Sequence, residues 1–327
     1  MKDSPNILFI SAFRAPFIQE DLDALSRRYR VHPLVGSGVG QLVPIVLGVL
    51  RADIVFCWFA SVYGAIGVIA ARLLGRKSVI VLGGVDIAKD ERLGYGIWLS
   101  WWRSKLVRYA LLKANRVLVS DLSMKKAATR LAEYTGGNIT YVPPGFDLDF
   151  WKPGGDKDPH ILTVAAVRDE GTMLRKGIDV LIESARRLPQ FTFSVVGADA
   201  RFVFDLNPPQ NMTFRAVVAR EELLPFYRSA KVYCQPSVIE ALCYTLREAM
   251  LCGCIPVASN VGGMTTAVSG IGLLVPPANV GALVAALLKA MQMPDEVGAK
   301  ARARMVALYP REKREAELQR IIEGFAS

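Results

Sequence analysis

Two acidic residues flank the point where a polar loop runs into an apolar stretch. Glu240 stands at the head of the loop, and Glu248 follows eight positions later, in the first turn of a run that predicts a helix. The free N–H groups at the start of a helix, with the helix dipole behind them, form a binding site for phosphate. A carboxylate on each side can hold sugar hydroxyls. The segment therefore predicts a site that grips a nucleotide-sugar by its diphosphate and its hydroxyls.

The residues that follow this segment strengthen the prediction. From Cys252 to Gly263 the chain reads Cys-Gly-Cys-Ile-Pro-Val-Ala-Ser-Asn-Val-Gly-Gly. Glu240, Glu248 and this run resemble the donor-site signature of family-four glycosyltransferases, the group 1 enzymes, which have the GT-B fold. In that family the first glutamate lies against the donor sugar and the second binds the ribose, and the resemblance implies these roles here. The alternative is a pair of unrelated acids that cap a surface helix, because Glu is common in first turns.

Two cations offer the positive charge that such a reaction needs. When the bond to a nucleoside diphosphate breaks, negative charge grows on the diphosphate, and positive groups must already be in place. Arg168 follows the expected strand Ile161–Ala166, and Lys176 precedes a glycine where the next helix opens. They resemble the paired Arg and Lys-Gly with which the family grips the phosphates, and the resemblance implies that role. Two exposed loop cations are the alternative, and Arg175 could replace Lys176.

The loop between the two glutamates departs from the family pattern. The family usually has a glycine and a proline where this chain has Cys243 and Thr245, and Cys243 adds bulk where glycine would permit close approach. The resemblance still implies donor-binding roles for the loop amides, since an N–H group does not depend on the side chain. These amides belong to Cys243, Tyr244, Thr245 and Leu246. Gly262 matches the family pattern, whereas Thr266 stands where an acid is usual.

The first half of the chain resembles the family less closely. Ser11–Pro16 stands where many members have a glycine pair, and Gly83 stands where many have a histidine, so a mechanism that uses that imidazole is not available. Asp86 follows an expected strand and is the best candidate for a carboxylate that faces the donor or the acceptor. Capping of a turn by Asp86 is the alternative. The residues expected to face the sugar or the acceptor are Asp86, Gly83, Gly84 and Arg14.

Neither the cysteines nor the paired acids predict a metal site. The five cysteines lack the paired spacing of a zinc site, and the chain has only two histidines. Asp21 with Asp23, and Asp147 with Asp149, resemble the metal-binding acid pairs of a different glycosyltransferase fold. We expect Asp21 and Asp23 on an exposed helix and Asp147 in a turn, and we interpret both pairs as coincidence. No metal is expected, and no cofactor apart from the nucleotide-sugar substrate.

Alternating strand-like and helix-like runs predict two parallel sheets covered by helices. The expected strands of the first half are Asn6–Ser11, Ile54–Phe59, Ser78–Leu82, Arg116–Ser120 and Asn138–Val142. Those of the second half are Ile161–Ala166, Phe191–Val196, Met212–Ala216, Val232–Gln235, Ile255–Ala258 and Gly272–Val275. The expected helices of the second half include Gly177–Arg187, Leu223–Ser229, Arg247–Cys252, Val280–Met291 and a charged tail over Pro310–Phe325.

Chain-breaking residues between Pro143 and Pro159 predict a hinge between two domains. We expect an α/β protein with two Rossmann-like parallel-sheet domains facing each other across a cleft, as the GT-B resemblance implies. Residues 1–150 would be the acceptor-side domain, residues 151–310 the donor domain, and residues 311–327 a helix that crosses back to the first domain. Ligands of open parallel sheets lie at the carboxyl ends of the strands.

Basic and aromatic residues gather in residues 98–130. The chain has a formal charge of +10, and the stretch from Trp101 to Arg130 holds eight basic residues and one acid. Trp98, Trp101 and Trp102 stand in the same region. Such a helix suits an anionic membrane surface, and a solvated helix whose tryptophans face the core is the alternative. Nucleic acid is not an expected partner, because no recognition motif accompanies the charge.

Two features bear on the location of the protein. The uncharged run Ile54–Ala71 is at the lower limit for a membrane span, but a Gly/Ser/Tyr-bearing break inside it predicts a strand followed by a helix. The N-terminus shows no signal-peptide pattern, and the cysteines lie mostly in apolar runs, as buried thiols of a reducing compartment do. We expect a cytoplasmic protein, peripheral at the inner face of the membrane if the basic helix binds lipid.

The sequence thus predicts a retaining, metal-independent hexosyltransferase. Its partners would be a nucleotide-diphosphate sugar donor and a hydroxyl of a glycan or lipid-linked acceptor. Two other classes stay open. An NAD-binding oxidoreductase lacks support, because no G-x-G-x-x-G follows the first strand. A non-catalytic nucleotide-sugar-binding protein is suggested by the departures at Gly83, Cys243 and Thr266.

Overall fold

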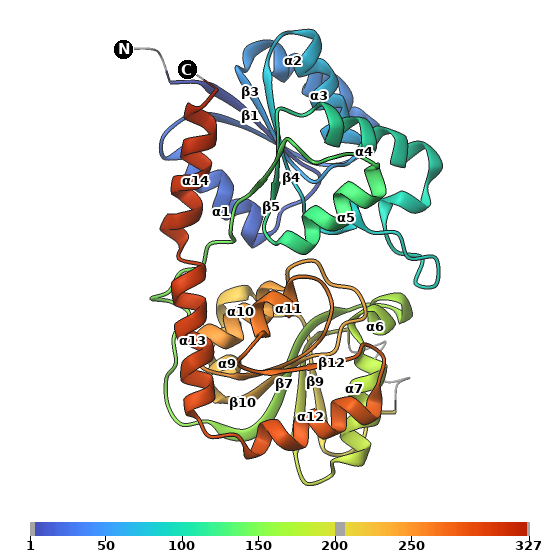
Figure 1. The fold of residues 1–327 in the computed structure, drawn as a ribbon, viewed down its shortest axis with the longest axis vertical. Coiled ribbons are helices and arrows are strands. Elements are labelled where there is room, and N and C mark those ends of the chain that lie inside the picture. The colour runs from blue at the N-terminus through green and yellow to red at the C-terminus, as the bar shows by residue number, and fades with distance from the viewer. Residues whose placement is uncertain (1–3, 200–206, 326–327) are drawn as a thin grey trace. The chain divides into compact units, whose positions relative to one another are not determined.

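A computed structural model describes residues 4–199 and 207–325 of the chain. The chain divides into two compact units (Figure 1). The first unit comprises Met1–Gly145 and Arg311–Ser327, and the second comprises Phe146–Pro310. Each unit contains one parallel sheet of six strands, so the expected α/β class is confirmed.

The sheet of the first unit has the strand order β2-β1-β3-β4-β5-β6. Its strands are β1 (Asn6–Ser11), β2 (Arg30–Val35), β3 (Ile54–Trp58), β4 (Lys77–Val81), β5 (Arg116–Val119) and β6 (Ile139–Tyr141). Its α-helices are α1 (Pro16–Ser26), α2 (Leu42–Arg51), α3 (Val62–Leu73), α4 (Trp101–Lys113), α5 (Leu122–Ala132) and α14 (Arg311–Glu323).

The uncharged run that begins at Ile54 forms β3 and α3. Every residue of β3 is buried, because a strand inside a covered parallel sheet has apolar neighbours on both faces. Ser61 then caps α3 by accepting a hydrogen bond from the amide of Gly64. Within the described ranges, no helix combines the length and the apolar character that crossing a bilayer requires.

The sheet of the second unit has the strand order β12-β11-β10-β7-β8-β9. Its strands are β7 (Asp158–Val167), β8 (Thr192–Ala198), β9 (Met212–Arg215), β10 (Ala230–Gln235), β11 (Ile255–Ser259) and β12 (Leu273–Val275). Its α-helices are α6 (Glu170–Lys176), α7 (Ile178–Arg187), α9 (Leu224–Ser229), α10 (Tyr244–Leu251), α11 (Gly262–Val268), α12 (Val280–Gln292) and α13 (Glu296–Leu308).

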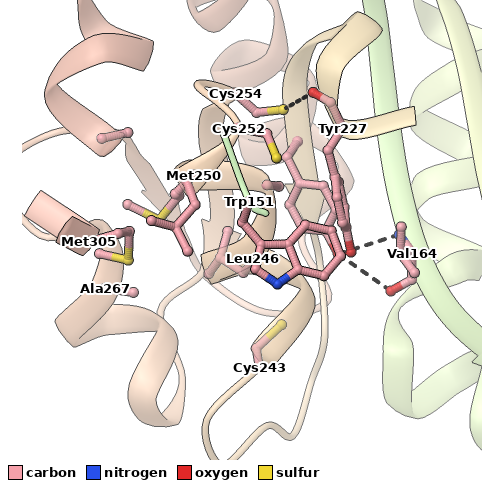
Figure 2. Packing of buried hydrophobic residues seen from close by; sticks show 14 of the residues in the cluster. Trp151, Val164, Tyr227, Cys243, Leu246, Met250, Cys252, Cys254, Ala267 and Met305 are labelled. Atoms are coloured by element: carbon pink, nitrogen blue, oxygen red, sulfur yellow. Dashed lines mark hydrogen bonds between the residues drawn. The ribbon is translucent and has the colours of Figure 1, made fainter. Parts of the chain in front are cut away.

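Both faces of the second sheet are covered by side chains. Along β10, Tyr233 packs into one buried cluster, whereas Val232 and Cys234 pack into another. This is the alternation expected of a strand, whose successive side chains point to opposite faces. Figure 2 shows the cluster that holds Tyr227 and Trp151, whose rings lie edge to face with their centroids 5.6 Å apart. The two clusters fix β10 and β7, the strands that lead to the site.

The last helix, α14, belongs to the first unit. It packs along α1, and the guanidinium of Arg314 donates two hydrogen bonds of 2.6 Å to the carboxylate of Asp21 (Figure 1 shows the two helices side by side). The indole of Trp58 donates to the same carboxylate at 3.1 Å. Asp21 is therefore buried, and the expectation that it lies on an exposed face was wrong. Its partner, Arg314, is too distant in sequence to be foreseen.

Every expected strand is present, with ends that differ by a few residues. The edge strand β2 was not expected, because Pro33 interrupts its apolar pattern and proline is tolerated in strands mainly at sheet edges. Helix α10 begins at Tyr244 rather than Arg247, so Glu248 lies in the second turn of the helix and not in the first.

Candidate functional site

Two neighbouring strands of the second unit place the candidate residues at one edge of the sheet. β7 and β10 pair in parallel, so their carboxyl ends lie together. β7 leads into α6, whose start is capped by Asp169; the carboxylate of Asp169 accepts a hydrogen bond of 2.7 Å from the amide of Thr172. β10 leads through the loop 236–243, the donor loop, into α10. The end of α6 and the donor loop thus meet.

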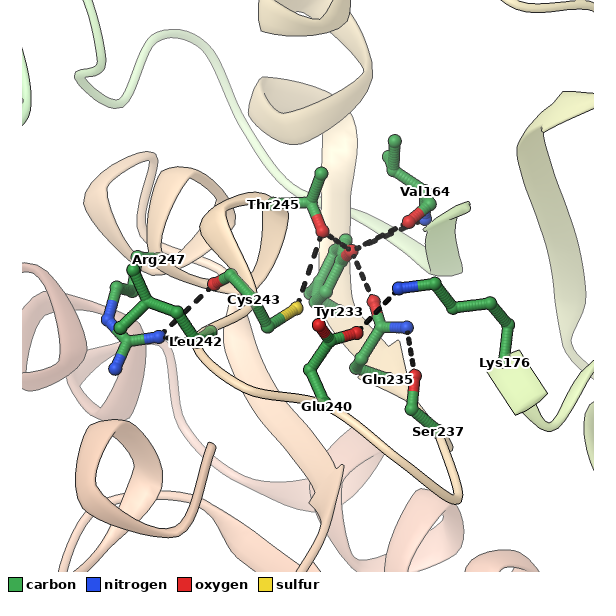
Figure 3. Close-up of polar contacts among 10 residues, drawn as sticks. All are labelled: Val164, Lys176, Tyr233, Gln235, Ser237, Glu240, Leu242, Cys243, Thr245 and Arg247. Carbon is green, nitrogen blue, oxygen red and sulfur yellow. Dashed lines mark hydrogen bonds and ion pairs between the residues drawn. The ribbon is translucent and has the colours of Figure 1, made fainter. Parts of the chain in front are cut away.

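Lys176 and Glu240 form an ion pair at this edge (Figure 3). Lys176 Nζ lies 2.5 Å from Glu240 Oε2, and the two side chains are 18% and 14% exposed. Burial lowers the pKa of Lys176. The negative charge of Glu240, the nearby Cys243 and the hydrogen bond to Glu240 together outweigh burial, and they raise the pKa above its ordinary value. The ammonium group of Lys176 is therefore charged at physiological pH, and a ligand that carries both negative charge and hydroxyls can compete for both partners.

Two glycines permit the close packing that brings the pair together. Gly177 has φ of +67°, and a Cβ there would lie 2.0 Å from the carbonyl oxygen of Pro236. Gly262 has φ of +51°, and a Cβ there would lie 1.8 Å from the carbonyl oxygen of Glu240. Any other residue at either position would push the donor loop out of place. The close packing of the donor loop thus explains why glycine follows Lys176 and why glycine stands at position 262.

Cys243 occupies the turn between the donor loop and α10. Its φ of +60° lies in the left-handed region that favours glycine, which explains why the family usually has glycine there. Its sulfur lies 3.5 Å from Thr245 Oγ1, which is 2.8 Å from the hydroxyl of Tyr233. Burial raises the pKa of the Cys243 thiol to about 11, so the group is neutral at physiological pH. Cys243 contributes bulk, not charge, to the site.

Arg247 is a site residue that the sequence analysis missed. It is completely buried in α10, and its guanidinium donates hydrogen bonds to the carbonyl groups of Leu242, Cys243 and Gly263 (Figure 3 shows the first two). A peptide group has its C=O and N–H on opposite sides. Because Arg247 holds these carbonyl groups toward itself, the following amides point away from it. The signal was a single arginine inside the apolar run after Tyr244.

Glu248 is buried in α10 and bound by two side chains. Its Oε1 accepts a hydrogen bond of 2.6 Å from Arg220 Nε, and its Oε2 accepts one of 3.1 Å from the hydroxyl of Tyr227. The guanidinium of Arg220 also lies 5.5 Å from the ring centre of Trp151. Sequence analysis did not single out Arg220 or Tyr227, because both lie upstream of the motif and become neighbours of Glu248 only in the fold.

The other expected donor residues lie around the same edge. Arg168 follows the end of β7 and has an exposed side chain; its amide is held by Thr172 at 3.0 Å. Tyr244 opens α10 and packs against Phe146, while Leu246 is buried in the core beneath the helix. The structure thus joins Lys176 to Glu240 directly, and it does not join Arg168 to that pair through any contact found in the described residues.

The corresponding edge of the first unit is closed. Asp86 is fully buried, and its carboxylate accepts hydrogen bonds from the amides of Ala60 (2.9 Å), Gly83 (3.1 Å) and Gly84 (2.7 Å). Burial raises the pKa of Asp86, and the hydrogen bonds oppose this effect. This position fits a capping role rather than a carboxylate that faces a ligand. Arg14 is exposed after β1.

Gly83 shows why the family histidine is absent. A Cβ on Gly83 would lie 1.8 Å from Cε1 of Phe59, so the ring of Phe59 fills the space that a side chain would need. Phe59 has φ of +71°, which directs its ring toward this position. Gly84 has φ of +132°, which favours glycine. The histidine is therefore replaced by glycine and phenylalanine acting as a unit.

No group of three or more His, Cys, Asp or Glu side chains suited to a metal ion occurs among the residues that the structure describes. All five cysteines are free thiols in buried positions.

Known proteins resemble part of this chain in sequence. Residues 158–293 match the family model described as "Glycosyl transferases group 1". The D-inositol 3-phosphate glycosyltransferase of Mycobacteroides abscessus is 29% identical over 184 residues, which cover 50% of this chain and 41% of that protein. The enzyme of the same name from Kribbella flavida is 30% identical over 192 residues, 50% of this chain and 45% of that protein. The match therefore spans less than half the length of these relatives.

Solved structures resemble the whole chain. Sucrose-phosphate synthase from Thermosynechococcus elongatus has a TM-score of 0.79 at 18% identity, covering 99% of this chain and 100% of that one. HepE from Anabaena, in complex with UDP-glucose, has a TM-score of 0.77 at 16% identity, covering 98% and 100%. At such identities the likeness shows the fold. Residues 158–293 thus resemble the group 1 glycosyltransferases, and the two sheets of the chain have the GT-B fold.

Proposed function

We propose that this protein transfers a sugar from a nucleoside-diphosphate donor to a hydroxyl of an acceptor. The observation that carries the proposal is the Lys176–Glu240 ion pair, 2.5 Å long, at the strand edge where the donor loop meets the start of α10. An ammonium group, a carboxylate and helix-start amides at one edge are the groups that a sugar diphosphate requires. The match of residues 158–293 to the group 1 glycosyltransferases supports the same function.

In the proposed mechanism Lys176 moves from Glu240 to the leaving diphosphate. The ammonium group then neutralises the charge that grows as the glycosidic bond breaks, together with Arg168 and the amides of Cys243, Tyr244, Thr245 and Leu246. Glu240, released from Lys176, accepts hydrogen bonds from the hydroxyls of the donor sugar. The binding of donor and the opening of the ion pair are thus one event.

Glu248 is proposed to bind the ribose. Its carboxylate is oriented by Arg220 and Tyr227, so the direction of its oxygen atoms is fixed before the donor arrives. Pre-orientation reduces the entropy that donor binding must overcome. Gly262 keeps the backbone of Glu240 close to α11 and so sets the distance between the two glutamates.

We further propose retention at the anomeric carbon without a metal ion, with the departing phosphate taking the proton of the acceptor hydroxyl. The closed edge around Gly83 and Asp86 supports this route, because it offers no imidazole and encloses its carboxylate among backbone amides. Transfer of the proton to the phosphate requires no further base. The roles of residues 1–150 toward the acceptor and 151–310 toward the donor are part of the same proposal.

The donor is proposed to be a uridine-diphosphate sugar, because a solved structure similar to this chain contains UDP-glucose. The acceptor is proposed to be a glycan or a lipid-linked molecule at an anionic membrane surface, reached through residues 98–130 on the cytoplasmic side. Trp101 is 72% and Trp102 is 44% exposed, with Lys105 and Arg103 stacked over their rings. These two tryptophans do not face the core, so the solvated-helix alternative in that form was wrong.

The test is transfer of labelled sugar from UDP-sugars by the wild type and by Glu240→Gln. Loss of the carboxylate charge is expected to lower turnover by about a hundredfold, while the midpoint of thermal unfolding changes little because a glutamine oxygen can still accept the hydrogen bond from Lys176. Glu323→Gln, on an exposed part of α14, is the matched control. Unimpaired transfer by Glu240→Gln would remove Glu240 from the mechanism, and absence of UDP-sugar binding by the wild type in a thermal-shift screen would refute the donor.

Two other functional classes, an oxidoreductase and a non-catalytic binding protein, can be tested against the proposal. An oxidoreductase is not favoured by the family match in residues 158–293, and titration with NAD is expected to show no binding. A non-catalytic binding protein would bind UDP-sugars but neither transfer nor hydrolyse the sugar, so the same assay separates it.

A further inference from the structure

Helix α2 of the first unit exposes an apolar side that its neighbours leave uncovered. The side chains of Val43, Val46, Leu47 and Leu50 are between 43% and 66% exposed. Their spacing of i, i+3, i+4 and i+7 puts them on one side of the helix. Val39, in the turn before α2, is 86% exposed. We call these five residues the α2 stripe.

The opposite side of α2 is also apolar. Ile45 and Val49 are buried against the unit, so the helix is hydrophobic on both sides. Residues 36–50 contain no Asp, Glu, Lys or Arg, and the first charge is Arg51 at the last position of α2. A helix that packs on a sheet and faces water on its outer side normally carries charged residues there. The outer side of α2 is therefore suited to an apolar environment, not to water.

Cations border the stripe at the end of the helix. α2 and α3 pack side by side, and both run antiparallel to the strands they connect, so their last residues lie at the same end (Figure 1). Leu73, at the end of α3, is 81% exposed. Three cations at the ends of these elements are exposed: Arg51 in the last turn of α2, Arg72 in the last turn of α3 and Lys77 at the start of β4. The nearest acid in the sequence, Asp53, accepts hydrogen bonds from Arg76 (3.3 Å) and from the amide of Asn6 (2.9 Å).

We propose that the α2 stripe inserts into the interface of an anionic lipid membrane. The valines and leucines would enter the boundary between head groups and acyl chains, while Arg51, Arg72 and Lys77 would contact anionic head groups. Apolar side chains next to exposed cations are the chemistry that such a surface recognises.

The inference goes beyond the proposed function and does not depend on the donor chemistry. It assigns a membrane contact to α2, separate from residues 98–130. α3 packs against both α2 and α4, so the two contacts belong to one row of helices on the first unit. Two weak contacts on one rigid unit strengthen each other, because the second binds at high effective concentration once the first is made.

The first experiment is co-sedimentation with vesicles of phosphatidylcholine alone and of phosphatidylcholine mixed with phosphatidylglycerol. The wild type is expected to pellet with the mixed vesicles, and Val43→Gln/Leu47→Gln to bind them at least about tenfold more weakly, since two apolar side chains are lost from the interface. Val306→Gln, on α13 of the second unit, is the matched control and is expected to bind like the wild type. Unfolding midpoints and donor affinity are expected to be unchanged, which separates this test from the proposed function.

The second experiment locates the contact. Because all native cysteines are buried, Leu47→Cys and Val306→Cys can each be labelled with an environment-sensitive fluorophore. Emission from position 47 is expected to rise with mixed vesicles and emission from position 306 to stay constant. Equal vesicle binding by the wild type and the double variant, or an unchanged signal at position 47, would overturn the proposal. A dimer in sedimentation velocity that the double variant abolishes would overturn it too, in favour of a second copy of the chain.

Discussion

The strand-end loops of the two units use charged groups in opposite ways. In the second unit, Lys176 and Glu240 pair side chain to side chain, and both keep some contact with water. In the first unit, Asp86 has no contact with water and is held by three backbone amides. The contrast separates a carboxylate that can change partners from one that is part of the fold.

The physical difference lies in what each carboxylate would have to give up. An ion pair that keeps some contact with water can be opened by a ligand that offers matching groups to both partners, because neither charge is then left without a partner. A buried carboxylate that loses its amide donors leaves several polar groups unpaired, which is costly. A family-level resemblance can suggest both residues as ligands, and only their surroundings distinguish them.

The largest expected effect comes from Lys176→Met. Loss of the ammonium group is expected to reduce turnover by about 10² to 10³, because the leaving diphosphate loses the cation that Glu240 holds in place. The unfolding free energy should fall by about 1 to 3 kcal/mol, because the largely buried carboxylate of Glu240 loses its partner. Turnover with a saturating donor and chemical denaturation of the same preparation measure the two quantities.

Arg175→Met is the matched variant, since Arg175 stands next to Lys176 and was the alternative phosphate cation. It is expected to retain most of the turnover, and its backbone role, in which the carbonyl group accepts a hydrogen bond from Val238 at 2.9 Å, does not depend on the side chain. If Arg175→Met is the inactive variant and Lys176→Met the active one, the ion pair is structural and the comparison between the two edges fails.

The next effect, on stability, comes from Asp86→Ala. The change leaves the amides of Ala60, Gly83 and Gly84 buried without their acceptor and is expected to reduce the unfolding free energy by about 3 kcal/mol. Donor affinity, measured by the ligand-induced shift of the unfolding midpoint, should stay near the wild-type value. Asp86→Asn keeps one acceptor oxygen and should lose less. A stable Asp86→Ala protein with impaired transfer would instead make Asp86 a residue that faces the reaction.

The fold followed from local patterns in the sequence. Buried strands such as Ile54–Trp58 are continuous apolar runs, and turn residues bound them, so each expected strand was found. β2 escaped because an edge strand buries less and tolerates Pro33. The start of α10 was predicted too late in the sequence. Cys243 ends the loop with φ of +60°, and a cysteine does not predict that backbone conformation.

The site was only partly predictable, because contacts between distant residues decide it. Lys176 and Glu240 were each predicted from a motif, and in the structure their side chains form an ion pair. Arg220 and Tyr227 reach Glu248 only because α9 and α10 pack together, and no spacing in the sequence encodes that. Arg247 was hidden in an apolar run, where a buried arginine that binds three carbonyl groups is rare enough to go unexpected. The sequence shows only that Gly83 stands in place of a histidine. The structure adds that the ring of Phe59 fills the space that a side chain at position 83 would need.

The smallest expected effect concerns pH, and it sharpens the comparison because the two units should respond in opposite directions. Burial lowers the pKa of His160 on β7, with Asp158 opposing, and its Nε2 has no hydrogen-bond partner among the described residues. The unfolded chain then binds the proton more readily, so the second unit loses stability as the pH falls through the ordinary histidine value. Burial raises the pKa of Asp86, so the folded first unit binds the proton more readily and gains stability as the pH falls toward the ordinary aspartate value.

Denaturation of the wild type, His160→Gln and Asp86→Asn between about pH 7 and about pH 4 measures both slopes. His160→Gln should remove the acid-side loss and Asp86→Asn the opposing gain; slopes that neither variant alters would mean that other groups set the pH response of both units.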